Sequence, residues 1–392
     1  MHRVFTHSVV GKDLQSKAES IAASPSGDRI FVGCADGTLL VYTCSVQPTP
    51  RDAFTSTPDV QLQFQLIDTR KRWCDEKRPI TFIEAVADWG VVLSICDGYL
   101  YVHNLATLDM LDKLKQTKYC NKFCVDARGS RVCVSIKHRL LVLGWTGKQF
   151  VEVKELHTPS TARSLVVRRR RRRRRRTKAD IYFQPYSNVL IFLSLNLQIF
   201  KSSNLQWVGS NLCVGFRREY NLLSVESGLI IKEVTDTGRK EKPLVALIDP
   251  IMPGAAAEEF LISNDNTGYF MDYSGVPSRS ESLTWSAVPM DVSCLHPYVV
   301  TMLPNKVDVH NVKTLTLAES ITVPGCRAMH LTTFPIGQVN RTVNQTHRPR
   351  KRVSTMLISS GKLGKKTSHP QTWVLPFKII IVDEDKTHDN FL

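Results

Sequence analysis

The sequence lacks the patterns that mark membrane spans, exported proteins and disulfide scaffolds. Its longest apolar stretch, residues 186–200, is interrupted by five polar residues and is shorter than the roughly 20 residues that cross a bilayer. The N-terminus has no apolar core of the kind found in signal peptides. The ten cysteines include no Cys-x-x-Cys pair, and the nearest spacing is that of Cys120 and Cys124. We therefore expect a cytoplasmic chain without a transmembrane anchor.

Motifs of catalysis and cofactor binding are also missing. The sequence has no Gly-x-Ser-x-Gly elbow and no His-Glu-x-x-His pair, and the stretch from Gly361 to Thr367 lacks the spacing of a phosphate loop. His103 and His138 stand beside apolar runs, and we interpret them as structural or surface residues. The acidic run at 383–385 has no shaped loop around it for a cation. We predict no enzyme, no cofactor and no metal site, and no partner-contacting residue can be named.

The net charge of +16 is confined to two segments. Residues 166–205 carry nine consecutive arginines, Arg168 to Arg176, with two lysines and one aspartate. Residues 331–392 carry ten Lys and Arg against four Asp and Glu. These two segments account for the whole excess, so the rest of the chain is neutral overall. A fold that is basic throughout is disfavoured, and we do not expect nucleic acid as the main partner.

The arginine run cannot be buried, because nine adjacent guanidinium groups repel one another and need water. One interpretation is an electrostatic adaptor, in which Arg168 to Arg176 bind anionic lipid, at about 1 kcal/mol per residue, or RNA phosphates. The other is an insertion without a selected role in a connection between two sheets. We favour the insertion. The second basic cluster, at 347–352, is interpreted in the same way as a solvated tail.

Helical periodicity is rare, and pairs of short apolar runs joined by a polar turn recur instead. Turns such as Asp36-Gly37 and Asp97-Gly98 supply the positive φ angles that tight hairpins need. We predict six hairpins, at residues 29–44, 90–105, 130–145, 211–225, 259–273 and 297–312.

The spacing of these hairpins favours a β-propeller. Their turn centres follow at intervals of 61, 41, 80, 48 and 39 residues, and the interval of 80 falls to 40 if residues 166–205 are an insertion. An interval near 40 is the length of one four-stranded blade. A β-sandwich, the main competitor, has no reason to keep a fixed interval. We predict an all-β propeller of a divergent class, because no Trp-Asp pair marks the blades.

An ordered set of short motifs supports this prediction. Its members are Val214 to Tyr220, Ile231-Lys232-Glu233, Thr237-Gly238 and Pro243 to Ala246, with Leu100 to Leu105, Arg131 to Lys137 and Pro297-Tyr298-Val299 elsewhere in the chain. In this order the set resembles the citron-homology (CNH) propeller of the vacuolar protein sorting-associated protein 39 and transforming growth factor-beta receptor-associated protein family. The resemblance covers roughly residues 20–330 without the insertion. Pro297-Tyr298-Val299 fits both branches of the family, and the Phe216 to Tyr220 block with Leu303-Pro304 favours the first by a small margin.

The resemblance implies a CNH-type propeller over residues 1–330, interrupted by the Arg-rich insertion 166–205, and a basic, poorly ordered tail at 331–392. The family suggests seven blades, whereas six hairpins are visible. We therefore expect a last blade that is either incomplete or completed by residues 353–362. A long helical solenoid and a zinc-binding module follow the propeller in full-length members, and neither pattern occurs after residue 330.

The resemblance also implies a function. It points to a subunit of a HOPS-like tethering complex, peripheral on late endosome and lysosome membranes. The expected partners are a late-endosomal Rab-type small GTPase and other tethering subunits. The expected process is fusion of endosomes and autophagosomes with lysosomes, in vesicle-mediated transport.

Overall fold

The computed structural model describes most of the residues before 336 and two later strands. The described ranges are 5–11, 16–24, 28–48, 60–75, 77–126, 129–137, 139–157, 204–215, 219–236, 244–248, 259–295, 298–323, 326–335, 352–360 and 377–382.

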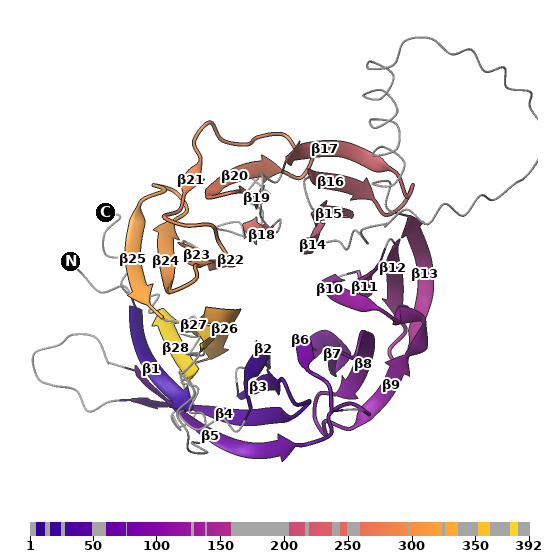
Figure 1. The fold of residues 1–392 in the computed structure, drawn as a ribbon, viewed down its shortest axis with the longest axis vertical. Helices are drawn as coiled ribbons and strands as arrows, with labels where there is room; N and C mark the ends of the chain where they lie inside the picture. Colours follow the sequence, from indigo (N-terminus) through magenta and orange to yellow (C-terminus); the bar gives the residue numbers. More distant parts are fainter. Residues whose placement is uncertain are drawn as a thin grey trace, which may run out of the picture.

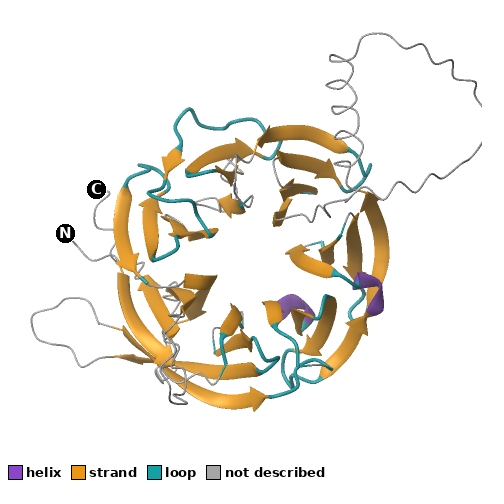
Figure 2. Ribbon diagram, viewed as in Figure 1, coloured by secondary structure: helices purple, strands orange, loops and turns teal. Residues whose placement is uncertain are grey.

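In these ranges twenty-eight strands form seven four-stranded sheets, arranged as blades around a central axis (Figure 1). The secondary structure in the described ranges is otherwise turns, loops and two short 3₁₀ turns, η1 (Ala87–Trp89) and η2 (Lys115–Thr117) (Figure 2). No helix in these ranges has the length and apolar character of a membrane span. The structure confirms the prediction of an all-β propeller.

Six blades are each built from four consecutive strands, and each blade is named here by its first and last strand. They are β2 (Ala18–Ala23), β3 (Arg29–Cys34), β4 (Leu39–Pro48) and β5 (Val60–Arg70); β6 (Ile80–Val86), β7 (Val91–Cys96), β8 (Tyr99–Asn104) and β9 (Met110–Leu114); β10 (Cys120–Asp126), β11 (Arg131–Ile136), β12 (Arg139–Trp145) and β13 (Phe150–His157); β14 (Asn204–Val208), β15 (Asn211–Gly215), β16 (Glu219–Ser224) and β17 (Ile230–Asp236); β18 (Val245–Ile248), β19 (Glu259–Asn264), β20 (Thr267–Asp272) and β21 (Leu283–Thr284); and β22 (Asp291–Leu295), β23 (Tyr298–Met302), β24 (Lys306–Asn311) and β25 (Leu317–Thr322).

The six predicted hairpins are the two middle strands of these six blades. All neighbouring strands within a blade are antiparallel, as in the pairing of β7 with β8, where Val91 faces Asn104 and Cys96 faces Tyr99. A middle strand packs against blades on both faces, so its side chains are buried almost without interruption; all six residues of β7 are buried. The outer strands are more exposed, and three of the five residues of β9 face solvent. Burial on both faces therefore explains the continuous apolar runs.

The seventh sheet joins the two ends of the described chain. Its order is β1 (Phe5–Gly11), β28 (Phe377–Val382), β27 (Arg352–Ser360) and β26 (Cys326–Pro335). Strand β28 pairs with β1 on one side, with Phe5 opposite Val382, and with β27 on the other, with Ser354 opposite Val382. The last blade is thus a complete four-stranded sheet.

This sheet corrects the expectation of a tail outside the propeller at 331–392, because β27 and β28 both lie in that range. The segment 353–362, expected to complete the blade as one hairpin arm, overlaps β27, which is one strand of this sheet. Long segments, 336–351 and 361–376, separate the three C-terminal strands. A hairpin pattern with a tight turn is therefore absent from the sequence here, and this absence led to the wrong expectation.

The predicted Arg-rich insertion falls between two blades. Strand β13 ends at His157 and β14 begins at Asn204, and Arg168 to Arg176 lie outside the described residues. The expected end of the insertion at 205 reaches two residues into β14. Asn204 and Leu205 pair with Gly215 and Val214, and the Leu205 side chain is buried.

Hydrophobic cores fill the spaces between neighbouring blades. One such core combines Leu93 and Leu100 of the β6–β9 blade with Val134 and Leu141 of the β10–β13 blade. Buried polar contacts also connect blades, and the Trp207 indole N–H donates to the carbonyl oxygen of Cys124 over 3.2 Å. Packing between blades, rather than within one, builds the core.

Tyr220 of β16 holds the β14–β17 and β18–β21 blades together. Its buried hydroxyl accepts a hydrogen bond from the Leu244 N–H at 2.9 Å and donates one to the Ser263 carbonyl oxygen at 2.6 Å. Both partners belong to the neighbouring blade, so one side chain ties two sheets through their backbones.

We expect Tyr220→Phe to lower the free energy of unfolding by about 1–3 kcal/mol, because the buried Ser263 carbonyl oxygen loses this donor and the Leu244 N–H keeps only its longer bond to Ser263 Oγ at 3.2 Å. Urea denaturation followed by far-UV circular dichroism measures this change. Tyr269→Phe is the matched control, since Tyr269 is 39% exposed on the adjacent blade. Equal stability of the two variants would show that the hydroxyl does not tie the blades.

Candidate functional sites

A pocket lies at the junction of the β6–β9 and β10–β13 blades. Its volume is about 460 Å³. The lining comes from the segment that links the two blades and from the turn between β11 and β12. The lining residues are Lys115, Gln116, Lys118, Tyr119, Ile136, Lys137 and Arg139.

The linking segment turns sharply at η2 and projects its polar side chains outward. The buried Thr117 hydroxyl fixes the turn, accepting from the Leu100 N–H at 2.9 Å and donating to the Leu114 carbonyl oxygen at 2.6 Å. The next residues, Lys118 and Tyr119, are exposed. Gly98 packs against Tyr119, since a Cβ at Gly98 would stand 3.3 Å from the Tyr119 Cα.

The turn between β11 and β12 forms the other side of the pocket and places Lys137 over the ring of Tyr119. Lys137 Nζ lies 3.6 Å from the centroid of the Tyr119 ring, and Lys118 Nζ lies 5.4 Å from it. Both Tyr119 and Lys137 have positive φ angles, 73° and 46°. Such angles are uncommon for residues other than glycine. Two strained turns from neighbouring blades therefore meet at this pocket.

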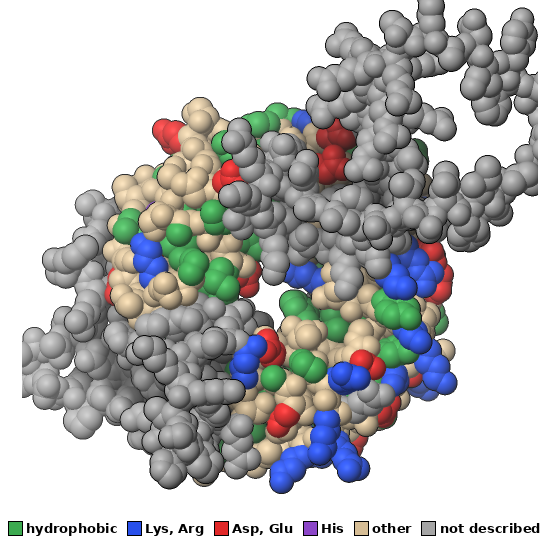
Figure 3. Space-filling view, viewed as in Figure 1, with side chains coloured by type: hydrophobic (Ala, Val, Ile, Leu, Met, Phe, Trp, Pro, Cys, Tyr) green, Lys and Arg blue, Asp and Glu red, His purple; other side chains and the backbone are tan. Residues whose placement is uncertain are grey.

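The pocket carries an excess of positive charge. Arg139 is paired with Glu155 at 2.5 Å. Lys115, Lys118 and Lys137 have no acidic partner within ion-pair distance among the residues that the structure describes. Lys and Arg side chains gather over the same two blades in the space-filling view (Figure 3). The pocket is thus suited to an anion.

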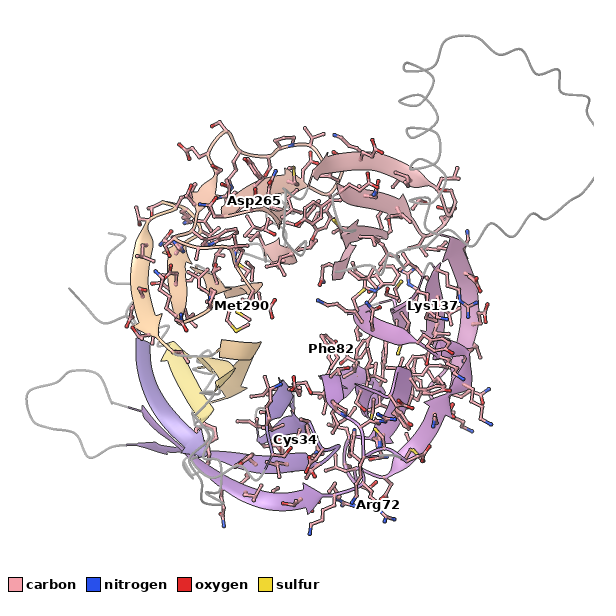
Figure 4. All side chains as sticks on the ribbon, in the orientation of Figure 1. Cys34, Arg72, Phe82, Lys137, Asp265 and Met290 are labelled. Carbon is pink, nitrogen blue, oxygen red and sulfur yellow. The ribbon has the colours of Figure 1, made fainter. Side chains whose placement is uncertain are left out.

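A second group of charges lies on the inner strands. Glu84 follows Phe82 by two residues on β6, so both occupy the same face of the strand, and Phe82 lies toward the centre of the ring (Figure 4). Burial raises the pKa of Glu84 to about 7, and the positive charge of Lys122 on β10 opposes this shift. Burial also raises the pKa of Asp291 on β22, again opposed by Lys122. One lysine thus offsets the charge of two carboxyl groups from different blades.

The histidines that the sequence singled out are not brought to either site. His103 is buried, stacks on Trp73 with 3.6 Å between ring centroids, and has Nε2 at 2.9 Å from the Trp73 carbonyl oxygen. Burial lowers its pKa to about 4, so it is neutral at physiological pH. This agrees with a structural role.

His138 and the acidic run 383–385 lie outside the described residues, and in the described ranges no three His, Cys, Asp or Glu residues gather as a metal site.

Sequence reasoning missed both groups of charges. The lysines of the pocket belong to two turns that are about 20 residues apart in the chain, and only the fold brings them together. The one available signal was the short basic run Lys113, Lys115 and Lys118 ending at Tyr119. Glu84, Lys122 and Asp291 sit in three separate strands with no common motif.

Comparison with known proteins agrees with this architecture. The CNH domain family matches residues 26–332 of the sequence. The chain belongs to the CNH domain family. The matched range contains the pocket, Glu84, Lys122 and Asp291, whereas β1 and most of the last sheet lie outside it.

Several relatives are vacuolar sorting proteins. Vacuolar sorting protein 39 of Arabidopsis thaliana is 24% identical over 310 residues, which cover 79% of this chain and 25% of that protein. The human Vam6/Vps39-like protein is 22% identical over 329 residues, covering 82% of this chain and 32% of that protein. This chain therefore spans about a quarter to a third of these relatives. They confirm the family resemblance found in the sequence.

Solved structures share the fold. The AfRom2 CNH domain has a TM-score of 0.53 and 13% identity, and the match covers 96% of this chain and 99% of that one. Saccharomyces cerevisiae Sqt1 also has a TM-score of 0.53, at 7% identity, with 94% and 99% of the two chains covered. At these identities the likeness concerns the fold alone.

The raised pKa of Glu84 predicts how stability depends on pH. The folded chain holds this proton more tightly than the unfolded chain, so the contribution of Glu84 to stability falls as pH rises from about 4.5 to about 7. Glu84→Gln removes this loss. We expect the variant to gain stability relative to wild type over this interval, by at most about 1.4 kcal/mol per pH unit.

Urea unfolding of both proteins at about pH 5 and about pH 8 measures the difference. Glu152→Gln, an exposed position on β13, is the control for loss of a carboxylate. A difference between Glu84→Gln and wild type that stays constant with pH would contradict the assignment.

Proposed function

We propose that this propeller is a non-enzymatic protein-interaction module of a late endosomal or lysosomal tethering complex of the HOPS type. The observation that carries the proposal is the match of about four-fifths of the chain to Vps39-like proteins of plants and animals. A further relative in Schizosaccharomyces pombe, 19% identical over 246 residues, is named vacuolar morphogenesis protein 6. These names connect the relatives with vacuolar sorting and vacuole form, and the proposal extends that setting to this chain.

We propose a Rab-type small GTPase as one partner, together with other subunits of the tether. A relative of another class supports a GTPase. The Rho1 guanine nucleotide exchange factor 2 of Schizosaccharomyces pombe is 22% identical over 144 residues, which cover 35% of this chain and 12% of that protein. Its name states an action on a small GTPase. Binding to a late-endosomal Rab in particular is tested by the experiment below.

The outer strands of two blades offer a surface for such a partner. Val153 on β13 is 56% exposed, and Leu229 and Ile231, beside and on β17, are 69% and 53% exposed. The two blades touch here, because a Cβ at Gly228 would lie 3.4 Å from the Leu156 side chain. Exposed apolar side chains on two blades that touch offer area for a protein contact. We define Val153, Leu229 and Ile231 as the rim patch.

A pulldown of the full chain with a late-endosomal Rab GTPase, loaded with GTP or with GDP, tests the partner. We expect preferential capture of the GTP form. Leu229→Glu with Ile231→Glu is expected to reduce capture at least about tenfold, since it places charges in an apolar contact. Leu66→Glu with Ile67→Glu is the matched control, because these residues are 47% and 53% exposed on β5.

Two results would contradict the proposal. Failure of the folded wild-type chain to capture either form would remove the GTPase as a partner. Equal loss in the rim-patch and control variants would remove the rim patch as the contact. Circular dichroism of each variant confirms that the chain is folded.

The second candidate function is the electrostatic adaptor, which the nine arginines favour by their charge alone. Deletion of residues 166–203 tests it and leaves β14 intact. We expect an adaptor to bind anionic vesicles or RNA, to lose this binding steeply with added salt, and to lose it on deletion. Sedimentation of vesicles and an RNA filter assay measure it. Binding that survives the deletion would rule the adaptor out.

A further inference from the structure

We propose that the pocket between the β6–β9 and β10–β13 blades binds a small ligand that carries two or more phosphate groups on a polyol, such as an inositol phosphate. This inference goes beyond the proposed function and does not depend on it. It rests on three lysines that line one cavity without an ion-pair partner among the described residues, on the contact between Lys137 and the Tyr119 ring, and on the volume of the cavity.

The pocket gathers three lysines that form no ion pair among the described residues, whereas some other cations of that part of the chain do form one. Lys113 is paired with Asp75 at 2.9 Å, and Lys306 with Asp308 at 2.9 Å. In contrast, Lys115, Lys118 and Lys137 line one pocket without an acidic neighbour at ion-pair distance within the described ranges. Like charges in one place repel, and an anion bound among them relieves the repulsion. The three charges match a ligand with more than one phosphate.

The tyrosine ring positions Lys137 without neutralising it. The ammonium group lies 3.6 Å from the centroid of the Tyr119 ring, which attracts the cation through its quadrupole. A carboxylate partner would occupy the N–H donors, whereas the ring lies on one side and leaves the other donors free for an anion.

The cavity favours a small ligand over a nucleic acid or a peptide. Its volume of about 460 Å³ lies within the range of small-molecule sites. Arg139, the one guanidinium in the lining, is already paired with Glu155, and the ring of Tyr119 is covered by Lys137. No free arginine fork or stacking surface is left in the lining for a base. Lysine ammonium groups bind phosphates as point charges and suit a compact polyphosphate.

The experiment uses the full chain and presents the phosphorylated inositol group in two forms, as a soluble molecule and as the headgroup of a membrane lipid. Inositol trisphosphate is titrated by calorimetry, and phosphatidylcholine vesicles with phosphatidylinositol bisphosphate are tested by sedimentation against vesicles with phosphatidylserine. The pocket variant is Lys118→Ala with Lys137→Ala. The control is Lys71→Ala with Lys148→Ala, which removes two exposed lysines outside the pocket. Deletion of 166–203 in each background separates the pocket from the arginine run.

We expect the pocket variant to bind the headgroup at least about tenfold more weakly, since each lysine makes a charge-assisted contact. The control pair and the deletion are expected to bind as wild type does. Pocket-dependent binding of inositol trisphosphate supports a ligand recognised by its headgroup in either source. Binding of the bisphosphate vesicles alone, still dependent on the pocket, supports a membrane lipid as the source.

Two results overturn the inference. One is the absence of binding to both probes by the folded wild-type chain. The other is an equal loss in the pocket and control variants, which would show non-specific attraction of anions. Neither result bears on the GTPase experiment, which uses a different surface.

Discussion

The pairing of β1 with β28 is the constraint on which the rest of the molecule depends. It joins residues from opposite ends of the described chain into one sheet, with Phe5 opposite Val382 and Thr6 opposite Ile381. Each of the other six sheets forms from four consecutive strands, but its apolar faces are buried only when its two neighbouring sheets pack against it. A ring that lacked the seventh sheet would expose the faces of the first and the sixth blade. Closure of the ring therefore covers the faces that the first and the sixth blade would otherwise expose.

Both groups of charges exist only because neighbouring blades pack face to face around this ring. The pocket needs the turn at Tyr119, which follows the β6–β9 blade, to meet Lys137 from the next blade. The inner group needs Glu84, Lys122 and Asp291 from three blades. The hydroxyl of Tyr220 and the indole of Trp207 fix such neighbours through backbone atoms. Function in this fold is thus a property of junctions, and no single sheet contains it.

Burial decides which parts of this fold can be predicted from the sequence. The middle strands of six blades were predicted because both their faces are buried, which leaves apolar runs such as Val91–Cys96. The last sheet was missed because long segments separate its strands. The pocket was missed for another reason: charge was summed over long segments, and the body of the chain is neutral overall. A neutral sum over the body of the chain concealed the local excess of Lys115, Lys118 and Lys137.

The pocket and the rim patch share the β10–β13 blade. Lys137 and Arg139 stand at the turn into β12, and Val153 lies on β13, two residues from the Glu155 that pairs with Arg139. A ligand in the pocket can change the affinity of a partner on the rim only if the blade has two arrangements that the ligand distinguishes. The structure gives the β10–β13 blade one arrangement, with a continuous antiparallel pairing of its four strands. The two surfaces are therefore expected to bind independently, so a phosphorylated ligand would add its binding energy to that of a protein partner without changing the partner's own affinity.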